Sequence, residues 1–153
     1  MNVKIEDNEI LVNGNTVMLG YWNDQQATNK VFKEGWLMTG DLGYIDDEGF
    51  LFLTGRKSNL IVFEDGIKLS PENLESEINN IPGVKECMVY STINNERTTI
   101  NVKVVVETEQ EVQVRNKIKE IAYEMQLTSR LRKIEFTKKE LPKNKLGKII
   151  RGR

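Results

Sequence analysis

The sequence predicts an α+β fold in which a small mixed sheet is packed with helices, preceded by a β segment that is rich in hairpins. Two observations predict it. From residue 58 onward, alternating apolar runs and two stretches with helical spacing follow the order β-β-α-β-β-α-β, which is typical of a compact α+β domain. Residues 1–54 hold short apolar runs between polar turns, with nothing to form a second layer. We therefore expect residues 1–54 to be a sliver of another domain.

The N-terminal elements follow from local patterns. Residues 3–13 alternate around an Asp-Asn turn and predict a hairpin. Residues 24–33 predict a short helix, for which Asp24 is the candidate N-cap. Residues 42–54 predict a second hairpin, because two apolar runs flank the charged turn Asp-Asp-Glu-Gly.

The first helix of the α+β domain is predicted from its start signals. Two short strands, NLIVF and IKL, precede it and flank an Asp-Gly turn. Ser70 is expected to cap the helix and Pro71 to occupy its first position, where no N–H is needed. The helix should end near residue 80, before Pro82-Gly83. Its expected buried stripe consists of Leu74, Ile78 and Ile81.

The rest of the domain is predicted to be two strands, a helix and a strand. The strands cover residues 84–92 and 98–107 and are joined by a turn at Asn94-Asn95. A long helix spans roughly 109–126, and a strand at 132–136 leads into a polar loop. The core face of the long helix is marked by Val114, Ile118, Ile121, Ala122 and Met125.

Composition excludes several kinds of chemistry. The chain has no histidine, so His-based triads, His general bases and His metal sites are excluded within it. The one cysteine, Cys87, allows no intrachain disulfide and is expected to be a small buried hydrophobe. No apolar run reaches the length of a membrane span, and the N-terminus lacks a signal-peptide pattern. We therefore expect a cytoplasmic protein without an integral membrane segment.

Charge is distributed unevenly along the chain. Residues 1–50 carry three basic and nine acidic side chains, whereas residues 130–153 carry ten basic and two acidic ones. A basic tail could bind nucleic acid, an acidic membrane surface or a phosphate-bearing small molecule. Nucleic acid ranks last, because the tail lacks interleaved aromatic residues and the rest of the chain is acidic.

The stretch Gly35–Arg56, GWLMTGDLGYIDDEGFLFLTGR, contains the most informative pattern. Asp41 follows a Thr-Gly turn directly, and Arg56 lies one hairpin away. A carboxylate presented from a tight turn suits the vicinal hydroxyls of a ribose, and a guanidinium suits a phosphate or the same sugar. Together they look like half of a nucleotide site.

Four motifs in order make the chain resemble the adenylate-forming superfamily of acyl- and aryl-CoA synthetases, luciferases and peptide-synthetase adenylation domains. They are EILVNGNTVMLGYWNDQQAT, the Gly35–Arg56 stretch, KSNLIVFEDGIKLSPENLE and LPKNKLGKIIR. The resemblance implies that residues 1–56 are the tail of a large N-terminal domain and that residues 57–153 are the mobile C-terminal lid. The third motif is most like the fatty acyl-CoA synthetase branch.

The resemblance also implies roles for individual residues. Asp41 corresponds to the residue that binds the ribose hydroxyls, and Arg56 to the arginine that contacts ribose and phosphate. Leu53 falls where an apolar side chain lies beside the nucleotide. Lys148 matches the catalytic lysine that reaches the α-phosphate and the substrate carboxylate.

The hinge and the thiolation loop are implied in the same way. Ser58, flanked by Lys57, stands at the hinge position, where the family often has Asp or Lys. The loop Phe63–Lys68 corresponds to the segment that faces the pantetheine channel, and Gly66 would let its backbone approach closely. No residue of this chain matches a metal ligand.

The implied reaction is carboxylate plus ATP to acyl-AMP and pyrophosphate, followed by transfer of the acyl group to CoA or to the phosphopantetheine of a carrier protein. The missing large N-terminal domain is expected to hold Mg²⁺, the phosphate loop and the pocket for the carboxylic acid. In the branch that the chain most resembles, this acid is a fatty acid. We expect the chain alone to be inactive. The alternative is a stand-alone binding module that docks a separate large domain or a carrier protein.

Overall fold

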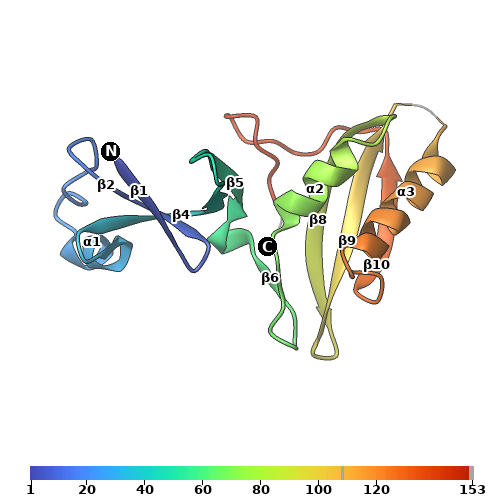
Figure 1. Cartoon of the computed structure of the whole chain (residues 1–153). Helices are drawn as coiled ribbons and strands as arrows, with labels where there is room; N and C mark the ends of the chain where they lie inside the picture. The colour runs from blue at the N-terminus through green and yellow to red at the C-terminus, as the bar shows by residue number, and fades with distance from the viewer. Residues whose placement is uncertain (108, 152–153) are drawn as a thin grey trace. The chain divides into compact units, whose positions relative to one another are not determined.

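The computed structural model describes residues 1–107 and 109–151 (Figure 1). Over these residues the chain forms two compact units, Met1–Asn59 and Leu60–Arg153. Among the described helices, none combines the length and the apolar character that crossing a bilayer requires.

The first unit is an antiparallel sheet with one short helix. The strand order is β1-β2-β4-β3, and β5 pairs with β4. Its elements are β1 (Asn2–Glu6), β2 (Glu9–Asn13), α1 (Gln25–Val31), β3 (Phe32–Lys33), β4 (Trp36–Ile45), β5 (Leu51–Arg56) and the 3-10 helix η1 (Lys57–Asn59).

Both hairpins predicted for this unit are present. The β1–β2 turn places Asp7 and Asn8 in the left-handed region, with φ of 50° and 64°, which these two residue types tolerate better than most. Asp24 accepts a hydrogen bond from the Ala27 N–H and caps α1 as predicted. Only Ile10, Leu11 and Leu42 are buried hydrophobic residues in this unit, which agrees with a sheet that has no second layer of its own.

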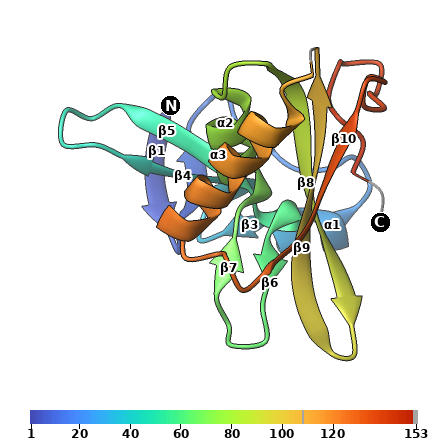
Figure 2. The same ribbon diagram turned by 90° about the vertical axis from the view of Figure 1, so that its right-hand side faces the viewer.

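The second unit is a three-stranded mixed sheet covered by two helices. The order is β10-β9-β8, with β9 antiparallel to β8 and parallel to β10. Helices α2 and α3 lie on the same face of this sheet (Figures 1 and 2). Its elements are β6 (Ile61–Val62), β7 (Lys68–Leu69), α2 (Pro71–Asn79), β8 (Val84–Asn94), β9 (Arg97–Val106), α3 (Glu111–Glu124) and β10 (Leu131–Thr137).

The core of the second unit lies between this sheet and the two helices, and the α+β prediction is confirmed. Leu74, Ile78 and Ile81 are buried as predicted. Of the predicted core face of α3, Val114, Ile118 and Ala122 are buried, and the remaining two residues are partly buried against the same core. Cys87 is 1% exposed and belongs to this core.

One local prediction held in part and another was wrong. Ser70 is the N-cap residue of α2 as predicted, but its hydroxyl makes no capping bond to the helix backbone and instead donates to the Glu72 carboxylate at 2.9 Å. The β8–β9 turn is centred on Asn95 and Glu96, with φ of 46° and 63°, not on Asn94-Asn95. The strand ladder extends to Asn94 and Arg97, so the two left-handed residues between them close the hairpin.

Candidate functional site

Asp41 and Arg56 are brought together by the ladder between β4 and β5. They are register partners, and Arg56 Nε lies 2.7 Å from Asp41 Oδ1. The side chain of Asp41 is 28% exposed and that of Arg56 is 52% exposed, so both remain within reach of a ligand. The structure therefore places side by side the carboxylate and the guanidinium that the sequence proposes as half of a nucleotide site.

A bulge in the ladder creates this pairing. From Ile45↔Leu51 to Gly43↔Leu53 the register is regular, and it then shifts by one residue between Leu42 and Gly43. A regular continuation would place Gly55 opposite Asp41. Gly43 has room for no side chain here, because a Cβ would lie 2.3 Å from the carbonyl oxygen of Phe52. The bulge therefore selects Arg56 as the partner of Asp41.

The stretch of β4 just before Asp41, predicted as a Thr-Gly turn, is instead an irregular part of the strand and is held by hydrogen bonds to β2. The hydroxyl of Thr39 donates to the Ile10 carbonyl at 2.8 Å and accepts from the Asp41 N–H at 3.1 Å. Gly40 adopts φ of 73°, and its N–H donates to Glu9 Oε1 at 3.1 Å. These bonds fix the backbone from which the Asp41 carboxylate projects.

Glu9 links this stretch of β4 to the candidate hinge. Its carboxylate is 7% exposed, and its second oxygen accepts from Lys57 Nζ at 2.6 Å. Lys57 and Ser58 both belong to η1, the last element of the first unit, and both are exposed. Sequence reasoning missed Glu9, because an acidic residue at the start of a hairpin strand gives no signal of burial.

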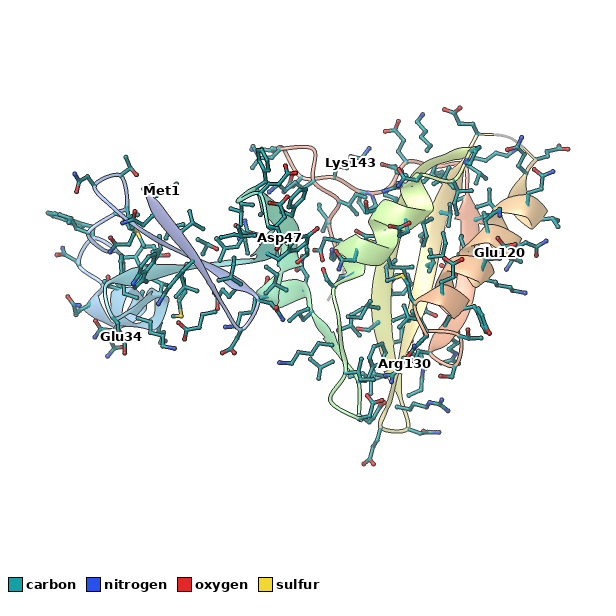
Figure 3. All side chains as sticks on the ribbon, in the orientation of Figure 1. Met1, Glu34, Asp47, Glu120, Arg130 and Lys143 are labelled. Carbon is teal, nitrogen blue, oxygen red and sulfur yellow. The ribbon has the colours of Figure 1, made fainter. Side chains whose placement is uncertain are left out.

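Leu53 lies on an exposed apolar hairpin. Its side chain is 69% exposed, and it stands on β5 opposite Gly43. Next to it, the rings of Tyr44 and Phe52 stack with centroids 5.2 Å apart, although both side chains are exposed. Asp47 is at the charged tip of the same hairpin (Figure 3).

Lys148 belongs to the second unit, where its loop is held by hydrogen bonds between residues of the loop itself. The backbones of Lys143 and Ile149 form an isolated antiparallel bridge. Between them, the side-chain oxygen of Asn144 accepts from the N–H groups of Leu146 at 2.9 Å and Lys148 at 3.0 Å. Gly147 has φ of 76°, which closes the turn. The ammonium of Lys148 is exposed and has no hydrogen-bond or ion-pair partner in the described part of the chain.

Gly66 forms the turn between β6 and β7. Its N–H donates to the Phe63 carbonyl at 2.9 Å, and its φ is 81°. A Cβ at Gly66 would meet no atom within 4 Å, so the backbone conformation and not crowding favours glycine. The turn is braced by Arg130, which pairs with Asp65 and places its guanidinium 4.0 Å from the Phe63 ring (Figure 3).

The structure thus gathers Asp41, Arg56 and Leu53 on the β4–β5 hairpin of the first unit, together with Lys57 and Ser58 in the element that follows it. Gly66 and Lys148 belong to the second unit. Across residues 1–107 and 109–151, no group of three or more acidic, Cys or His side chains is arranged to hold a metal ion. The chemistry that these residues offer is recognition of a diol, a phosphate and a developing negative charge.

No family model matches the chain, but curated proteins do. Over 148 residues it is 34% identical to 4-coumarate–CoA ligase 3 of Oryza sativa, which is 95% of this chain and 26% of that protein. Over 149 residues it is 33% identical to a long-chain-fatty-acid–CoA ligase of Bacillus subtilis, 97% of this chain and 26% of that protein. Over 84 residues it is 43% identical to the long-chain-fatty-acid–CoA ligase FadD15 of Mycobacterium tuberculosis, 55% of this chain and 14% of that protein.

Solved structures agree with these matches. The o-succinylbenzoate CoA synthetase of Bacillus subtilis in complex with its acyl-adenylate superposes with a TM-score of 0.81 at 29% identity, over 97% of this chain and 32% of that one. The anthranilate CoA ligase AuaEII in complex with anthranoyl-AMP gives a TM-score of 0.78 at 28% identity, over 97% of this chain and 31% of that one. The chain thus spans about a quarter to a third of the length of such full-length relatives.

Proposed function

Because the chain belongs to the adenylate-forming superfamily and matches the C-terminal part of its CoA ligases, we propose that it supplies the ribose-binding, hinge and lysine-bearing segments of an ATP-dependent acid–thiol ligase. The observation that carries the proposal is the pairing of Asp41 with Arg56 at 2.7 Å across β4 and β5. The substrate is a carboxylic acid, and the thiol is that of CoA or of a carrier phosphopantetheine.

In this proposal the first unit holds the nucleotide. The carboxylate of Asp41 accepts hydrogen bonds from the two ribose hydroxyls, and Arg56 donates to the ribose and the phosphate. Arg56 also keeps the carboxylate oriented, because its Nε already occupies one oxygen. Leu53 offers an exposed apolar contact for the nucleotide from the same strand.

Lys148 would act in the first half-reaction. A carboxylate oxygen attacks the α-phosphorus of ATP, the bond from that phosphorus to the leaving oxygen breaks, and pyrophosphate departs. Two anions approach each other in this step, so an ammonium that has no competing partner in the described chain can neutralise the charge that develops.

The second half-reaction would use another part of the lid. The thiol sulfur attacks the acyl carbon and AMP leaves. We propose that rotation about Lys57 and Ser58 removes Lys148 and brings the turn at Gly66 to the pantetheine channel. We assign the Mg²⁺ that accompanies ATP to the large domain of the ligase, as the family resemblance implies.

The chain alone should have no adenylating activity. It contributes a carboxylate and a guanidinium to the nucleotide, but the remaining phosphate and acid contacts belong to the large domain. Acid-dependent exchange of ³²P-pyrophosphate into ATP is the direct measurement, and robust exchange by the isolated chain would contradict the fragment hypothesis.

The catalytic role is tested in a chimera. The chain replaces the matching C-terminal quarter of the Bacillus subtilis long-chain-fatty-acid–CoA ligase, to which it is 33% identical. Lys148→Ala should abolish adenylation and largely spare thiolation of a supplied acyl-adenylate. Lys145→Ala is the matched control, because Lys145 is an exposed lysine of the same loop. Equal loss of both half-reactions in Lys148→Ala would count against the role of this lysine.

A further inference from the structure

The loop that carries Lys148 is fastened to the second unit at both ends, each time by a carboxylate from a different element. At the start of the loop, Glu86 of β8 accepts a hydrogen bond from the Leu141 N–H at 2.7 Å. The same carboxylate forms an ion pair with Lys143 Nζ at 2.7 Å. The Glu86 side chain is 13% exposed, so solvent screens this contact only in part. Figure 3 labels Lys143 on this loop.

At the exit of the loop, Glu75 of α2 holds Arg151. The two carboxylate oxygens accept from the two terminal nitrogens of the guanidinium at 2.6 Å each, which is the bidentate arrangement. One of those nitrogens also donates to the Val89 carbonyl at 2.9 Å, and Glu75 accepts from the Val89 N–H at 2.7 Å. Arg151 is therefore tied to α2 and to β8 at once.

Both carboxylates are costly to bury without partners, and each is satisfied by the loop. Glu75 is 8% exposed as a residue, and its helix places it against the sheet with Leu74 and Ile78 of the core. A buried carboxylate needs a cation or several donors. The loop supplies a cation to each of them. Without the docked loop, Glu75 and Glu86 would be buried without these cationic partners.

We propose that Glu86, Glu75 and Arg151 are positioning residues for Lys148. With both ends clamped and the tip closed by Asn144, the ammonium of Lys148 projects from a loop whose backbone is already ordered. Ordering the loop before the ATP complex forms lowers the entropy that must be lost in the adenylation step. This inference rests on the proposed function of Lys148.

The first test concerns the loop itself and uses this chain. Amide hydrogen exchange of Leu146 and Lys148 is followed in Glu86→Gln and Arg151→Gln. Exchange should accelerate about 10-fold when a charge-assisted clamp is removed, while the amides of Val102 and Ile118 in the core stay protected. Unchanged exchange at Leu146 and Lys148 in both variants would overturn the proposal.

Three further variants keep this test informative. Glu140→Gln is the matched control, because this glutamate is also next to the loop, but within residues 1–107 and 109–151 its only ion pair is a long, exposed one with Lys85 at 3.9 Å. Glu75→Gln removes the bidentate anion of Arg151, leaves only the longer ion pair with Glu72 at 3.6 Å among the described residues, and can unfold α2. Arg151→Lys, which retains the charge but not the bidentate geometry, is therefore measured beside it. An intermediate exchange rate in Arg151→Lys supports the clamp.

The second test separates positioning from stability in the chimeric ligase. Glu86→Gln and Arg151→Gln should lower the adenylation rate about 10- to 100-fold and leave thiolation of a supplied acyl-adenylate unchanged. If Lys148→Ala loses adenylation while both clamp variants retain it, the positioning role is refuted and the proposed function stands. If Lys148→Ala itself retains adenylation, the proposed function fails, and the positioning role fails with it.

Discussion

Arg56 Nε lies 2.7 Å from Asp41 Oδ1, and these two residues face each other directly across β4 and β5. More than half of the Arg56 side chain is exposed, and ion pairs with this exposure contribute little to folding. We therefore propose that the pair serves to present a carboxylate and a guanidinium side by side to a ligand. Removal of the pair should therefore lower the efficiency of nucleotide use more than the free energy of unfolding.

Arg56→Gln tests this separation. The free energy of unfolding of the chain should change by less than about 1 kcal/mol, because the ion pair is largely solvated. In the chimeric ligase the same substitution should lower kcat/KM for ATP by about 10-fold or more, because charge-assisted bonds to the nucleotide are lost. Urea denaturation and pyrophosphate exchange measure the two effects. Lys33→Gln, which removes an exposed pair with Glu6 in the same sheet, should leave kcat/KM unchanged.

Gly43→Ala should separate Asp41 from Arg56 without changing either residue. The new Cβ would lie 2.3 Å from the Phe52 carbonyl oxygen, so the strands at the bulge must move apart. We expect about 1–3 kcal/mol of destabilisation in the first unit, together with a loss of ATP use in the ligase. Faster amide exchange in β4 would report the first effect. Wild-type exchange there would show that the bulge tolerates a side chain.

Cys87 should be inert in the folded chain. Burial, reinforced by the negative charge of Glu75, raises the pKa of this thiol to about 12. At pH 8 only about one thiol in 10,000 is then ionised, and the thiolate is the reactive form. A thiol-specific disulfide reagent should therefore label the chain only after denaturant is added. Rapid, stoichiometric labelling of the native chain would contradict this burial.

The clamp at Glu86 should weaken in acid. Burial opposes ionisation of this carboxyl, but the hydrogen bonds from Lys143 and the Leu141 N–H outweigh it and lower its pKa below the ordinary value of 4.5. Because the folded-state pKa is the lower one, the carboxylate adds stability above pH 4.5 and loses it as pH falls through the folded-state value.

The measurement compares the wild type with Glu86→Gln between pH 7 and pH 3. The difference in their free energies of unfolding should be constant above about pH 5 and shrink below it. The hydrogen bond to Glu86 raises the pKa of Lys143 above its ordinary value, so this lysine remains charged throughout the range and does not contribute to the change. A difference that does not vary with pH would mean that the pKa of Glu86 is the same in the folded and unfolded chain.

Apolar periodicity predicted the second unit well. Leu74, Ile78 and Ile81 recur at helical spacing and are buried as that spacing requires. The alternating run that contains Cys87 became a central part of β8. Such patterns are local, because each residue reports the face of its own element.

The polar contacts that shape the site could not be predicted in the same way. Glu9 and Glu75 are acidic residues at ordinary strand and helix positions, and their burial depends on Lys57 and Arg151, which are 48 and 76 residues away. The proximity of Asp41 to Arg56 depends on the bulge at Gly43, and neither residue signals it. Ser70 matched the N-cap preference, yet its hydroxyl donates a hydrogen bond to the nearby Glu72 carboxylate and makes no capping bond to the helix backbone.

The hairpin β4–β5 also bears on the tendency of the chain to self-associate in solution. In the described part of the first unit, β5 pairs with β4 alone, and it carries the exposed side chains of Leu51, Phe52 and Leu53. An outer strand with apolar side chains is a template on which a second strand can pair. Oligomers should therefore accumulate as the protein is concentrated, and lysine substitutions along β5 are the natural means of keeping samples monodisperse.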